Sequence, residues 1–532
     1  MMEEPTSALA KTSTVLKNII VTIVMVVALA IFVMSVLFTT LVVNYTVGYD
    51  FLDIGQNCAL AGAIAALALF GLYALLLRSR RMEGMEESRI IAVATVAALA
   101  MSALWVVLAD VVPFSDDKNI FLVGVAMVQR DHAWLNSSPY YQAFPYQATM
   151  ELLIGLFYRL FGIHAVKALQ LLQCACAAAT VAFVALICRE LFSSRRATLA
   201  CCWLLVSFFP LYFYATFIYG HVMALPFLFA ALWLQMRWFN AQRWPYAVLA
   251  GLCASVCLLL KSSYAAVLIA MLITWVLHSL STRKMGGLVF AVVMLVMFEA
   301  LNTCALRASV AVSGCEYETD RSIPTLGNLA MGLHDDPPRS IGPGWFDAWI
   351  WDQQYESKSE FTEACKDEVL SCAVDLAKDP QRAAGFFGRK LVSEWTEPTY
   401  LSLLYSNCTM QSGDWPYVGY TNYGREVPAV IDGIYYGPTS TLLLYLMDGL
   451  QTLIYGMALV YLAKRRYSIQ IGEVTPLLML AGGFVLFAFW EAKSQYVMVY
   501  VLAMVPYAAY GLTCVVDWLG RRLGKGSRRG LD

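Results

Sequence analysis

The sequence predicts an all-α polytopic membrane protein, and three observations lead to this fold class. Hydrophobic residues make up 59% of the 532-residue chain and charged residues only 14%, whereas a soluble protein carries about 25% charged residues. The mean hydropathy is +0.61. The apolar residues are also gathered into blocks near the ~20-residue length with which a helix crosses a bilayer.

About twelve spans are expected, one for each apolar block. The first block is too long for the core of a cleaved signal peptide and is not followed by a small-residue cleavage site, so it counts as a span. The predicted spans are 16–43, 57–77, 90–112, 165–188, 197–215, 219–238, 245–260, 264–281, 285–307, 438–462, 474–491 and 496–518.

The basic residues of the short connections predict the orientation of the bundle. With twelve spans, the Lys- and Arg-rich connections and the basic C-terminal tail all fall on one side of the membrane. Because such connections stay in the cytoplasm, both termini of this multi-pass cell-membrane protein are expected there. The opposite, extracytoplasmic side receives 44–56, 113–164 and 308–437. No basic patch interleaved with aromatic residues predicts a nucleic-acid partner.

This topology divides the chain into four parts. Residues 1–89 form a two-span extension with a charged cytoplasmic linker, which stands apart from the core in sequence. The core spans lie in 90–307, and their first outer loop, 113–164, is expected to hold an outer helix followed by an interfacial amphipathic one. Residues 308–437 have the composition of an extracytoplasmic subdomain, and 438–532 contain the last three spans and the basic tail.

The fourteen cysteines fall into two groups. Those in or beside the spans are expected to pack as small apolar residues. Cys315, Cys365, Cys372 and Cys408 lie in the outer segment, where two disulfides are plausible and the pairing is open. No CxxC pair is present, so a structural zinc site is not expected.

The first outer loop contains the strongest candidates for chemistry. Its segment 113–147, PFSDDKNIFLVGVAMVQRDHAWLNSSPYYQAFPYQ, breaks abruptly from an apolar run into carboxylates, aromatic residues and prolines. Asp116 and Asp117 stand immediately outside a predicted span, where the cost of charge marks a residue as a functional candidate. The alternative is that the two acids cap the helix that follows them.

Two lysines interrupt apolar surroundings at the outer ends of later spans. Lys261 lies in LLLKSSYAAV and Lys493 in FAFWEAKSQYVMVY. Outer cations run against the positive-inside bias, which favours an anionic ligand near the outer leaflet, such as a lipid phosphate. Snorkelling at the interface explains either lysine alone equally well.

The order of these motifs resembles the GT-C glycosyltransferases. It is more similar to the protein O-mannosyltransferase and lipid A aminoarabinose transferase superfamily (glycosyltransferase family 39-like), in its bacterial cell-surface branch. The likeness covers about residues 90–518 and rests on SDD, YYQAFPYQ, TFIYGH, LLKSSYA, NLAMGLHDD, GRKLVSEWTEP and WEAKSQY. It implies a GT-C-type bundle of about twelve transmembrane helices with outer-face juxtamembrane helices and an extracytoplasmic loop subdomain.

Members of this superfamily transfer a sugar from a polyprenyl-phosphate carrier to an acceptor at the outer face, with inversion. The resemblance implies that Asp116 is the general base, and Asp117 is the alternative. Gln495 replaces the family's usual arginine before the tyrosine, which moves the expected phosphate contact onto Lys493. The expected substrate-binding residues are Tyr146, Gln147, Arg159, Tyr219, Lys261, Lys390, Glu491 and Lys493.

No cofactor is expected, although the resemblance leaves a divalent metal ion open, because some GT-C enzymes use one. The run His334-Asp335-Asp336 looks like metal ligands, but the closer relatives use no divalent ion and no second ligand cluster is evident. The expected partners are a polyprenyl-phosphate sugar donor, an acceptor that is a glycan, a teichoic acid or a protein, and membrane lipids. Two other functions stay open: a transporter or flippase of lipid-linked sugars, and a non-catalytic scaffold for envelope assembly. Transporters usually show internal repeats and paired broken helices at the midplane, whereas the polar residues here gather at the outer boundary.

Overall fold

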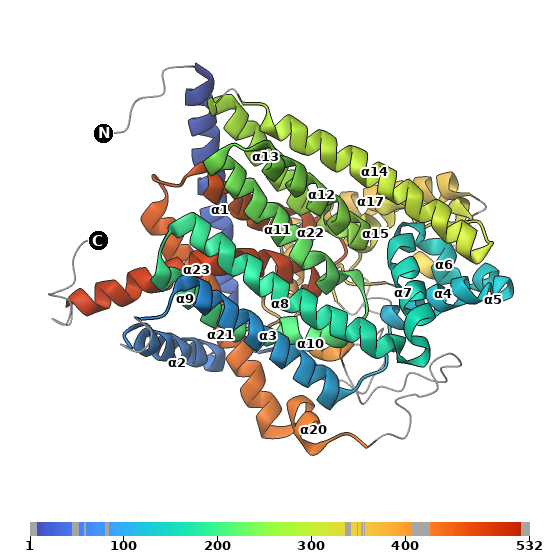
Figure 1. The fold of residues 1–532 in the computed structure, drawn as a ribbon, viewed down its shortest axis with the longest axis horizontal. Helices are drawn as coiled ribbons and strands as arrows, with labels where there is room; N and C mark the ends of the chain where they lie inside the picture. Colours follow the sequence, from blue (N-terminus) through green and yellow to red (C-terminus); the bar gives the residue numbers. More distant parts are fainter. Residues whose placement is uncertain are drawn as a thin grey trace.

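The protein is a bundle of long helices with a cap of shorter helices at one end (Figure 1). The computed structural model describes residues 8–44, 53–57, 60–79, 84–282, 284–335, 342–347, 349–352, 355, 357–406 and 426–522.

Each of the twelve predicted spans corresponds to helical structure. Among the described residues, ten helices are long and apolar enough to cross a membrane, and Arg195–Val206 with Phe209–Thr216, bent by 52°, form an eleventh if they are one span. The twelfth block is a shorter apolar helix. The helices of the bundle are α1 (Ala8–Leu37), α2 (Leu60–Leu77), α3 (Glu87–Ala109), α8 (Ala165–Phe192), α9 (Arg195–Val206), α10 (Phe209–Phe213), α11 (Gly220–Ala241), α12 (Trp244–Leu260), α13 (Ala265–Thr282), α14 (Gly286–Ser313), α21 (Gly437–Arg465), α22 (Val474–Phe489) and α23 (Ser494–Arg522).

The first predicted span ends earlier than expected, because a small sheet follows it. Helix α1 ends at Leu37, and the β-branched stretch after it forms strand β1 (Thr39–Asn44), which pairs antiparallel with β2 (Asp53–Asn57). β-Branched residues favour strands, and the backbone N–H of Thr40 donates to the carbonyl of Thr396 at 3.1 Å. The otherwise α-helical fold therefore contains one two-stranded sheet in its described part.

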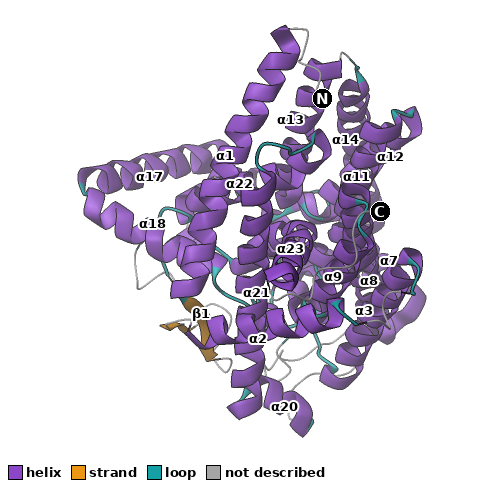
Figure 2. Cartoon of the chain, turned by 90° about the vertical axis from the view of Figure 1, so that its left-hand side faces the viewer, coloured by secondary structure: helices purple, strands orange, loops and turns teal. Residues whose placement is uncertain are grey.

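The two N-terminal helices are packed into the bundle. Helix α1 contacts α13, α21 and α22, and α2 contacts α21, as Figure 2 also shows for α1 beside α22. Side chains of α1 reach distant carbonyls: Ser13 Oγ donates to Leu277 at 3.0 Å, and Lys17 Nζ to Ile469 at 2.9 Å. Although 1–89 stands apart in sequence, its helices share the core of the later spans.

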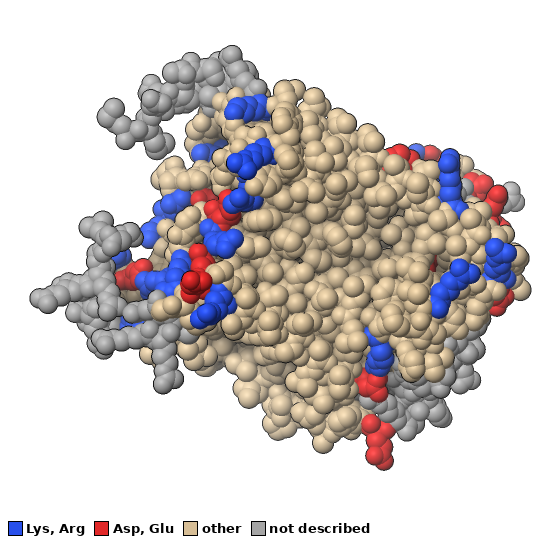
Figure 3. Space-filling view, in the orientation of Figure 1, with Lys and Arg blue, Asp and Glu red and all other residues tan. Residues whose placement is uncertain are grey.

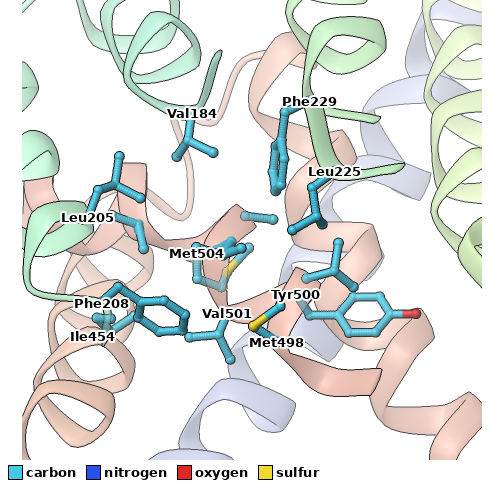
Figure 4. Close-up of a cluster of buried hydrophobic side chains, with 14 of the residues drawn as sticks. Val184, Leu205, Phe208, Leu225, Phe229, Ile454, Met498, Tyr500, Val501 and Met504 are labelled. Carbon is cyan, nitrogen blue, oxygen red and sulfur yellow. The ribbon is translucent and has the colours of Figure 1, made fainter. Parts of the chain in front are cut away.

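Helix α23 forms the centre of the bundle. It is buried along nearly all of its length, and it contacts α8, α9, α21 and α22. Figure 4 shows Met498, Val501 and Met504 of α23 among apolar side chains of the surrounding helices, including Val184 and Leu225. Burying such a side chain contributes roughly 1.5–3 kcal/mol relative to exposing it to water. These apolar contacts therefore help to hold the interior of the bundle together.

A cap of helices covers the end of the bundle opposite to the end where α23 finishes (Figure 1). Gly124 and Gly155 permit close packing of two cap helices, because a Cβ on either would lie 2.7 Å from an atom of the other helix. The cap helices are α4 (Asp116–Gln129), α5 (His132–Ser137), α6 (Pro139–Ala143), α7 (Ala148–Phe161), α15 (Thr325–Met331), α16 (Trp349–Asp352), α17 (Lys358–Lys378), α18 (Pro380–Trp395), α19 (Ser402–Tyr405) and α20 (Ala429–Tyr435).

The surface charges lie mainly at the two ends of the molecule. Figure 3 shows a broad band without Lys, Arg, Asp or Glu between the two charged ends. At one end, Arg196 pairs with Asp517 near the end of α23; at the other, charges surround the cap. An uncharged belt between polar ends is what a bilayer requires of the surface that it covers.

The described residues contain neither of the two disulfides that the sequence made plausible. Cys315, Cys365 and Cys372 are free thiols, and Cys408 lies outside the described residues. Cys315 is buried beside α4 and α7, whereas Cys365 packs with Met331, Ile350 and Phe361 in a separate cluster. The fold places these thiols in different hydrophobic cores, so composition alone gave a wrong prediction.

Candidate functional site

The two acids of the first outer loop have different surroundings at the start of α4. Asp117 is buried, and its Oδ1 accepts the backbone N–H groups of Ser115 and Lys118, each at 3.1 Å. Burial raises the pKa of Asp117 to about 8, although these two hydrogen bonds oppose the shift. Asp116 is the first residue of the helix and remains partly exposed. Asp117 is therefore mostly protonated at neutral pH and holds the helix start, while Asp116 faces the neighbouring polar groups.

Lys493 and Glu491 form a buried ion pair on the short link between α22 and α23. Lys493 Nζ lies 3.0 Å from Glu491 Oε1, and Tyr496 donates to the other carboxylate oxygen at 3.3 Å. The link is fixed by backbone hydrogen bonds from Glu491 to Asn328 and from Ala492 to Gly344. Burial lowers the pKa of Lys493, but the surrounding groups, Glu491 first among them, together outweigh this effect and raise that pKa well above its usual value. These groups therefore favour the charged form of Lys493.

Lys261 lies between α12 and α13 and faces aromatic rings. Its Nζ is 4.8 Å from the ring centre of Tyr219 and 5.7 Å from that of Tyr496. A Cβ on Gly220 would lie 1.8 Å from the carbonyl oxygen of Leu260, so this glycine lets the start of α11 approach the end of α12. Burial and then the charge of Lys493 lower the pKa of Lys261 to about 7, against the opposing effect of Asp116 and Glu491.

These electrostatic effects place Asp116, Lys261, Glu491 and Lys493 in one region. The charge of Asp116 acts on both lysines, and each lysine responds to Glu491. We call these four residues the charged cluster. It joins residues from α4, from the α12–α13 link and from the α22–α23 link at the capped end of the bundle.

A hydrogen-bonded group borders the charged cluster. Gln147 Nε2 donates to the hydroxyl of Tyr219 at 2.7 Å and to that of Tyr140 at 3.2 Å. Tyr146 is 53% exposed and lies within electrostatic range of Asp116, Glu491 and Lys493. Gln147 and Tyr219 therefore fix one wall of the region, and Tyr146 stands at its rim.

His221 lies in the same region, although it is not among the substrate-binding residues expected from the sequence. Its ring stacks with Tyr219 and Tyr496 at centroid distances of 5.5 Å and 6.1 Å. The side chain is buried, and among the described residues neither ring nitrogen has a hydrogen-bond partner. Buried polar groups are usually satisfied by protein, water or a ligand, so His221 is a further candidate for a substrate contact.

Two of the expected substrate-binding residues have other surroundings: Lys390 is bound to backbone carbonyls, and Arg159 lies outside the charged cluster. Lys390 Nζ donates to the carbonyls of Gly332 and Trp490, each at 2.6 Å, so it supports the link that carries Glu491. Arg159 is exposed near the end of α7 and lines a small cavity of about 160 Å³ beside Glu151. The structure does not bring Arg159 into the charged cluster.

Sequence reasoning missed one buried acid below the charged cluster. Glu397 accepts hydrogen bonds from the backbone N–H groups of Thr399 and Leu401 and, at 2.7 Å, from Ser494 Oγ at the start of α23. It thereby joins the loop after α18 to the helix that begins directly after Lys493. The acid is visible in the sequence, but nothing in its local pattern identifies Ser494 as its partner.

Among the described residues, one group has the composition and spacing of a metal site. It consists of His334, Glu368 and Cys372, and it contains no member of the charged cluster.

Comparison with known proteins supports one class of function. A family described as dolichyl-phosphate-mannose-protein mannosyltransferase matches residues 149–301. This segment is less than half of the chain; it includes Tyr219, His221 and Lys261 and excludes Asp116 and Lys493. No curated protein matches the chain. The match and the apolar helices together support a membrane glycosyltransferase of the GT-C type. Over residues 149–301 the protein is similar to this mannosyltransferase family, and its apolar helices are those of a multi-pass membrane protein.

Proposed function

We propose that the protein transfers a sugar from a polyprenyl-phosphate-linked donor to an acceptor hydroxyl on the extracytoplasmic face, with inversion. The acceptor is a glycan, a teichoic acid or a protein. Asp116 is the general base, and Lys493 and Lys261 bind the phosphate of the donor. Tyr219, Gln147 and Glu491 hold the surrounding groups in position.

The observation that carries this proposal is a pair of neighbouring cations, Lys261, which is partly buried, and Lys493, which is buried. Burial lowers the pKa of Lys261, and repulsion from the charge of Lys493 lowers it further. A phosphate between them would relieve the repulsion and would form charge-assisted hydrogen bonds, which are about twice as strong as neutral ones. Two such lysines at the capped end of the bundle match the phosphate head group of a polyprenyl-phosphate carrier.

The proposed reaction needs one proton transfer and one displacement. The Asp116 carboxylate accepts the proton of the acceptor hydroxyl as its oxygen attacks the anomeric carbon. The bond from that carbon to the phosphate oxygen breaks on the opposite face, which inverts the anomeric configuration. The polyprenyl phosphate leaves with the bonding electrons, and the two lysines stabilise its increased negative charge.

Replacement of Asp116 tests the proposed base. General-base assistance contributes about 10²–10⁴-fold to a rate, so Asp116→Asn should reduce sugar transfer by at least ~10²-fold while the donor still binds. Transfer is measured with a radiolabelled lipid-linked sugar, and binding by equilibrium partition of the same lipid into purified protein.

Asp131→Asn is the matched control. Asp131 caps α5 by accepting the N–H of Trp134 at 3.1 Å, and asparagine caps equally well, so this variant should transfer at the wild-type rate. Full activity of Asp116→Asn would contradict the proposed base. If neither the wild type nor Asp116→Asn transferred sugar, and Asp116→Asn still translocated the lipid, the result would instead favour a flippase.

A further inference from the structure

A second polar site lies in the outer subdomain, apart from the charged cluster. His334 follows α15, and Glu368 and Cys372 lie one turn apart on α17. One ligand atom from each, an imidazole nitrogen, a carboxylate oxygen and the sulfur, lie within 4.8 Å of one another. Residues four positions apart on a helix face the same side, so α17 presents both of its ligands toward His334.

The imidazole of His334 is held between two carboxylates. Its Nδ1 lies 2.8 Å from Asp347 Oδ2, and its Nε2 lies 3.1 Å from Glu368 Oε1. A neutral imidazole carries a single N–H and can donate to only one of them. Since His334 and Asp347 are buried, the second contact requires an added proton, on the ring or on Glu368, or a cation shared by Nε2 and Glu368.

The distances fit a shared zinc ion. Ligands at about 2.0 Å (N or O) and about 2.3 Å (S) from a tetrahedral zinc lie about 3.3 Å apart for N and O, and about 3.5 Å for S and O. The observed separations are 3.1 Å between Nε2 and Glu368 Oε1 and 3.6 Å between Cys372 Sγ and the same oxygen. Both distances to Glu368 are therefore close to those between ligands of one ion, and His334 Nε2 and Cys372 Sγ lie within 4.8 Å of each other.

The second coordination sphere has the arrangement that zinc sites use. Histidine ligands commonly donate their other ring nitrogen to a carboxylate, which fixes the ring and its tautomer. Asp347 occupies that position, and its other oxygen accepts the backbone N–H of Trp349 at 2.9 Å. The imidazole is thus oriented with Nε2 toward Glu368 and Cys372.

We propose that His334, Glu368 and Cys372 bind one divalent transition-metal ion, with zinc the best fit, and that Asp347 orients the histidine. The fourth position faces an open cavity of about 320 Å³ that Asp375 also lines, so water or this carboxylate completes the tetrahedron. Binding displaces the thiol proton of Cys372 to solvent and leaves the sulfur as a thiolate.

The other charges around the cavity are compatible with a cation. Arg382 lines the cavity, but its guanidinium is directed to Asp335 at 3.9 Å, and Arg389 pairs with the same carboxylate at 3.3 Å. A cysteine ligand binds a metal ion as a thiolate, so binding releases the thiol proton and should strengthen as the pH rises.

The ion would connect the outer subdomain to the transfer site. It would join α17 to the turn that carries His334, whose carbonyl accepts the N–H of Gly344 at 2.8 Å. The carbonyl of Gly344 in turn accepts the N–H of Ala492, between Glu491 and Lys493, at 2.7 Å. We assign the ion a structural role, which is separate from the chemistry of sugar transfer.

Cobalt binding to the purified full-length protein tests the site. The protein is stripped with a chelator in detergent and titrated with Co²⁺, and a thiolate ligand is recognised by a sulfur-to-cobalt charge-transfer band in the near ultraviolet. Zinc affinity is measured by competition with a chromogenic chelator, and stoichiometry by elemental analysis. We expect about one ion per chain and a charge-transfer band that zinc abolishes.

Three variants make the result specific. Cys372→Ser should lose the band and bind zinc at least ~10-fold more weakly, and Asp347→Asn should weaken binding about 10–100-fold. Cys365→Ser is the matched control, because Cys365 is also a buried cysteine of α17 but lies in another cluster; it should behave as wild type.

The proposal is overturned if the wild-type protein shows no charge-transfer band. A band that persists in Cys372→Ser, or that disappears equally in Cys365→Ser, overturns it as well. Elution as a single species on size exclusion shows that each variant is folded. If Cys372→Ser aggregates, the wild-type band and its displacement by zinc decide the question.

Discussion

The partly buried ammonium of Lys261 makes donor binding depend on pH. Its pKa of about 7 means that Lys261 is charged below pH 7 and increasingly neutral above it. A bound phosphate favours the charged form, so binding above pH 7 requires proton uptake and the apparent Kd should rise, by up to about tenfold per pH unit. A phosphodiester donor does not titrate in this range, so the change belongs to the protein.

Lys261→Arg should flatten this profile, because arginine stays protonated. The measurement is the Kd for a polyprenyl phosphosugar between pH 6 and 9. Lys167→Arg is the control: Lys167 pairs with Asp110 at 2.5 Å, outside the charged cluster, and should leave the profile unchanged. An identical slope in Lys261→Arg and wild type would argue against a phosphate contact from Lys261.

Asp117 should limit stability at alkaline pH. Its folded-state pKa is raised to about 8, above the ordinary value of about 4 for an unfolded aspartate. Between these values the folded state holds a proton that the unfolded state has lost, so stability falls as the pH rises from about 4 to 8. Asparagine resembles the protonated acid and keeps the Oδ1 acceptor for Ser115 and Lys118.

The Asp117→Asn variant should therefore lose less melting temperature than wild type between pH 5 and pH 8, and it should keep most of its transfer activity. Thermal unfolding in detergent and the radiolabelled transfer assay measure the two properties. If Asp117→Asn abolished transfer while Asp116→Asn did not, Asp117 would be the base.

The sequence was sufficient to select candidate residues but not to identify their contacts. Carboxylates and lysines at the outer ends of spans are visible because charge is rare there, and Asp116, Lys261 and Lys493 were found in this way. The partners of Lys390 are backbone carbonyls, which carry no signal in the side-chain pattern. Arg159 was chosen for its charge, and its distance from the charged cluster depends on packing of α7.

At the scale of elements, the loop between α18 and α19 depends on one buried acid. Tyr400 and Leu401 have positive φ angles of 51° and 60°, which cost non-glycine residues roughly 1–2 kcal/mol each. Glu397 compensates by accepting hydrogen bonds from Thr399, Leu401 and Ser494. Since α23 begins at Ser494, this loop also determines where Lys493 lies.

Glu397→Gln should destabilise the protein by about 1–3 kcal/mol, because an amide turns an NH₂ group toward donors that need an acceptor. The melting temperature in detergent should fall, and proteolysis within 396–401 should become faster. Glu363→Gln on the surface of α17 is the control: the side chain is 67% exposed, and surface ion pairs contribute about 0–1 kcal/mol. Equal melting temperatures for both variants would contradict this role for Glu397.

Long apolar blocks in the sequence predicted the positions of the helices. The structure departs from these predictions where tertiary contacts favour a conformation that the local hydropathy pattern does not indicate. The β-branched residues after Leu37 continue the hydrophobic run of α1, so hydropathy alone could not separate the strand from the helix. The bend between α9 and α10 falls within one apolar block. The group of His334, Glu368 and Cys372 escaped notice because its members come from two elements and form no sequential motif.

For the whole molecule, the arrangement of charge supports a single orientation in the membrane. Helix α1 begins, and helix α23 finishes, at the side of the bundle that lies away from α4 and α17 (Figure 1). The basic connections on that side predict that it is cytoplasmic. The charged cluster then faces the extracytoplasmic side. The proposed transfer reaction requires this orientation, because its donor and acceptor meet outside the cytoplasm.

Cysteine labelling in intact cells measures the orientation directly. Glu363 on α17 is exposed at the capped end, and Tyr467, 76% exposed, lies in the connection between α21 and α22 at the other end. We expect a membrane-impermeant maleimide to label Glu363→Cys in intact cells, and to label Tyr467→Cys only after permeabilisation. Labelling of the wild-type protein measures the background signal from its native cysteines. The reverse pattern would place Asp116 in the cytoplasm, where a base for an extracytoplasmic acceptor has no substrate, and the glycosyl-transfer mechanism proposed for this face would have to be abandoned.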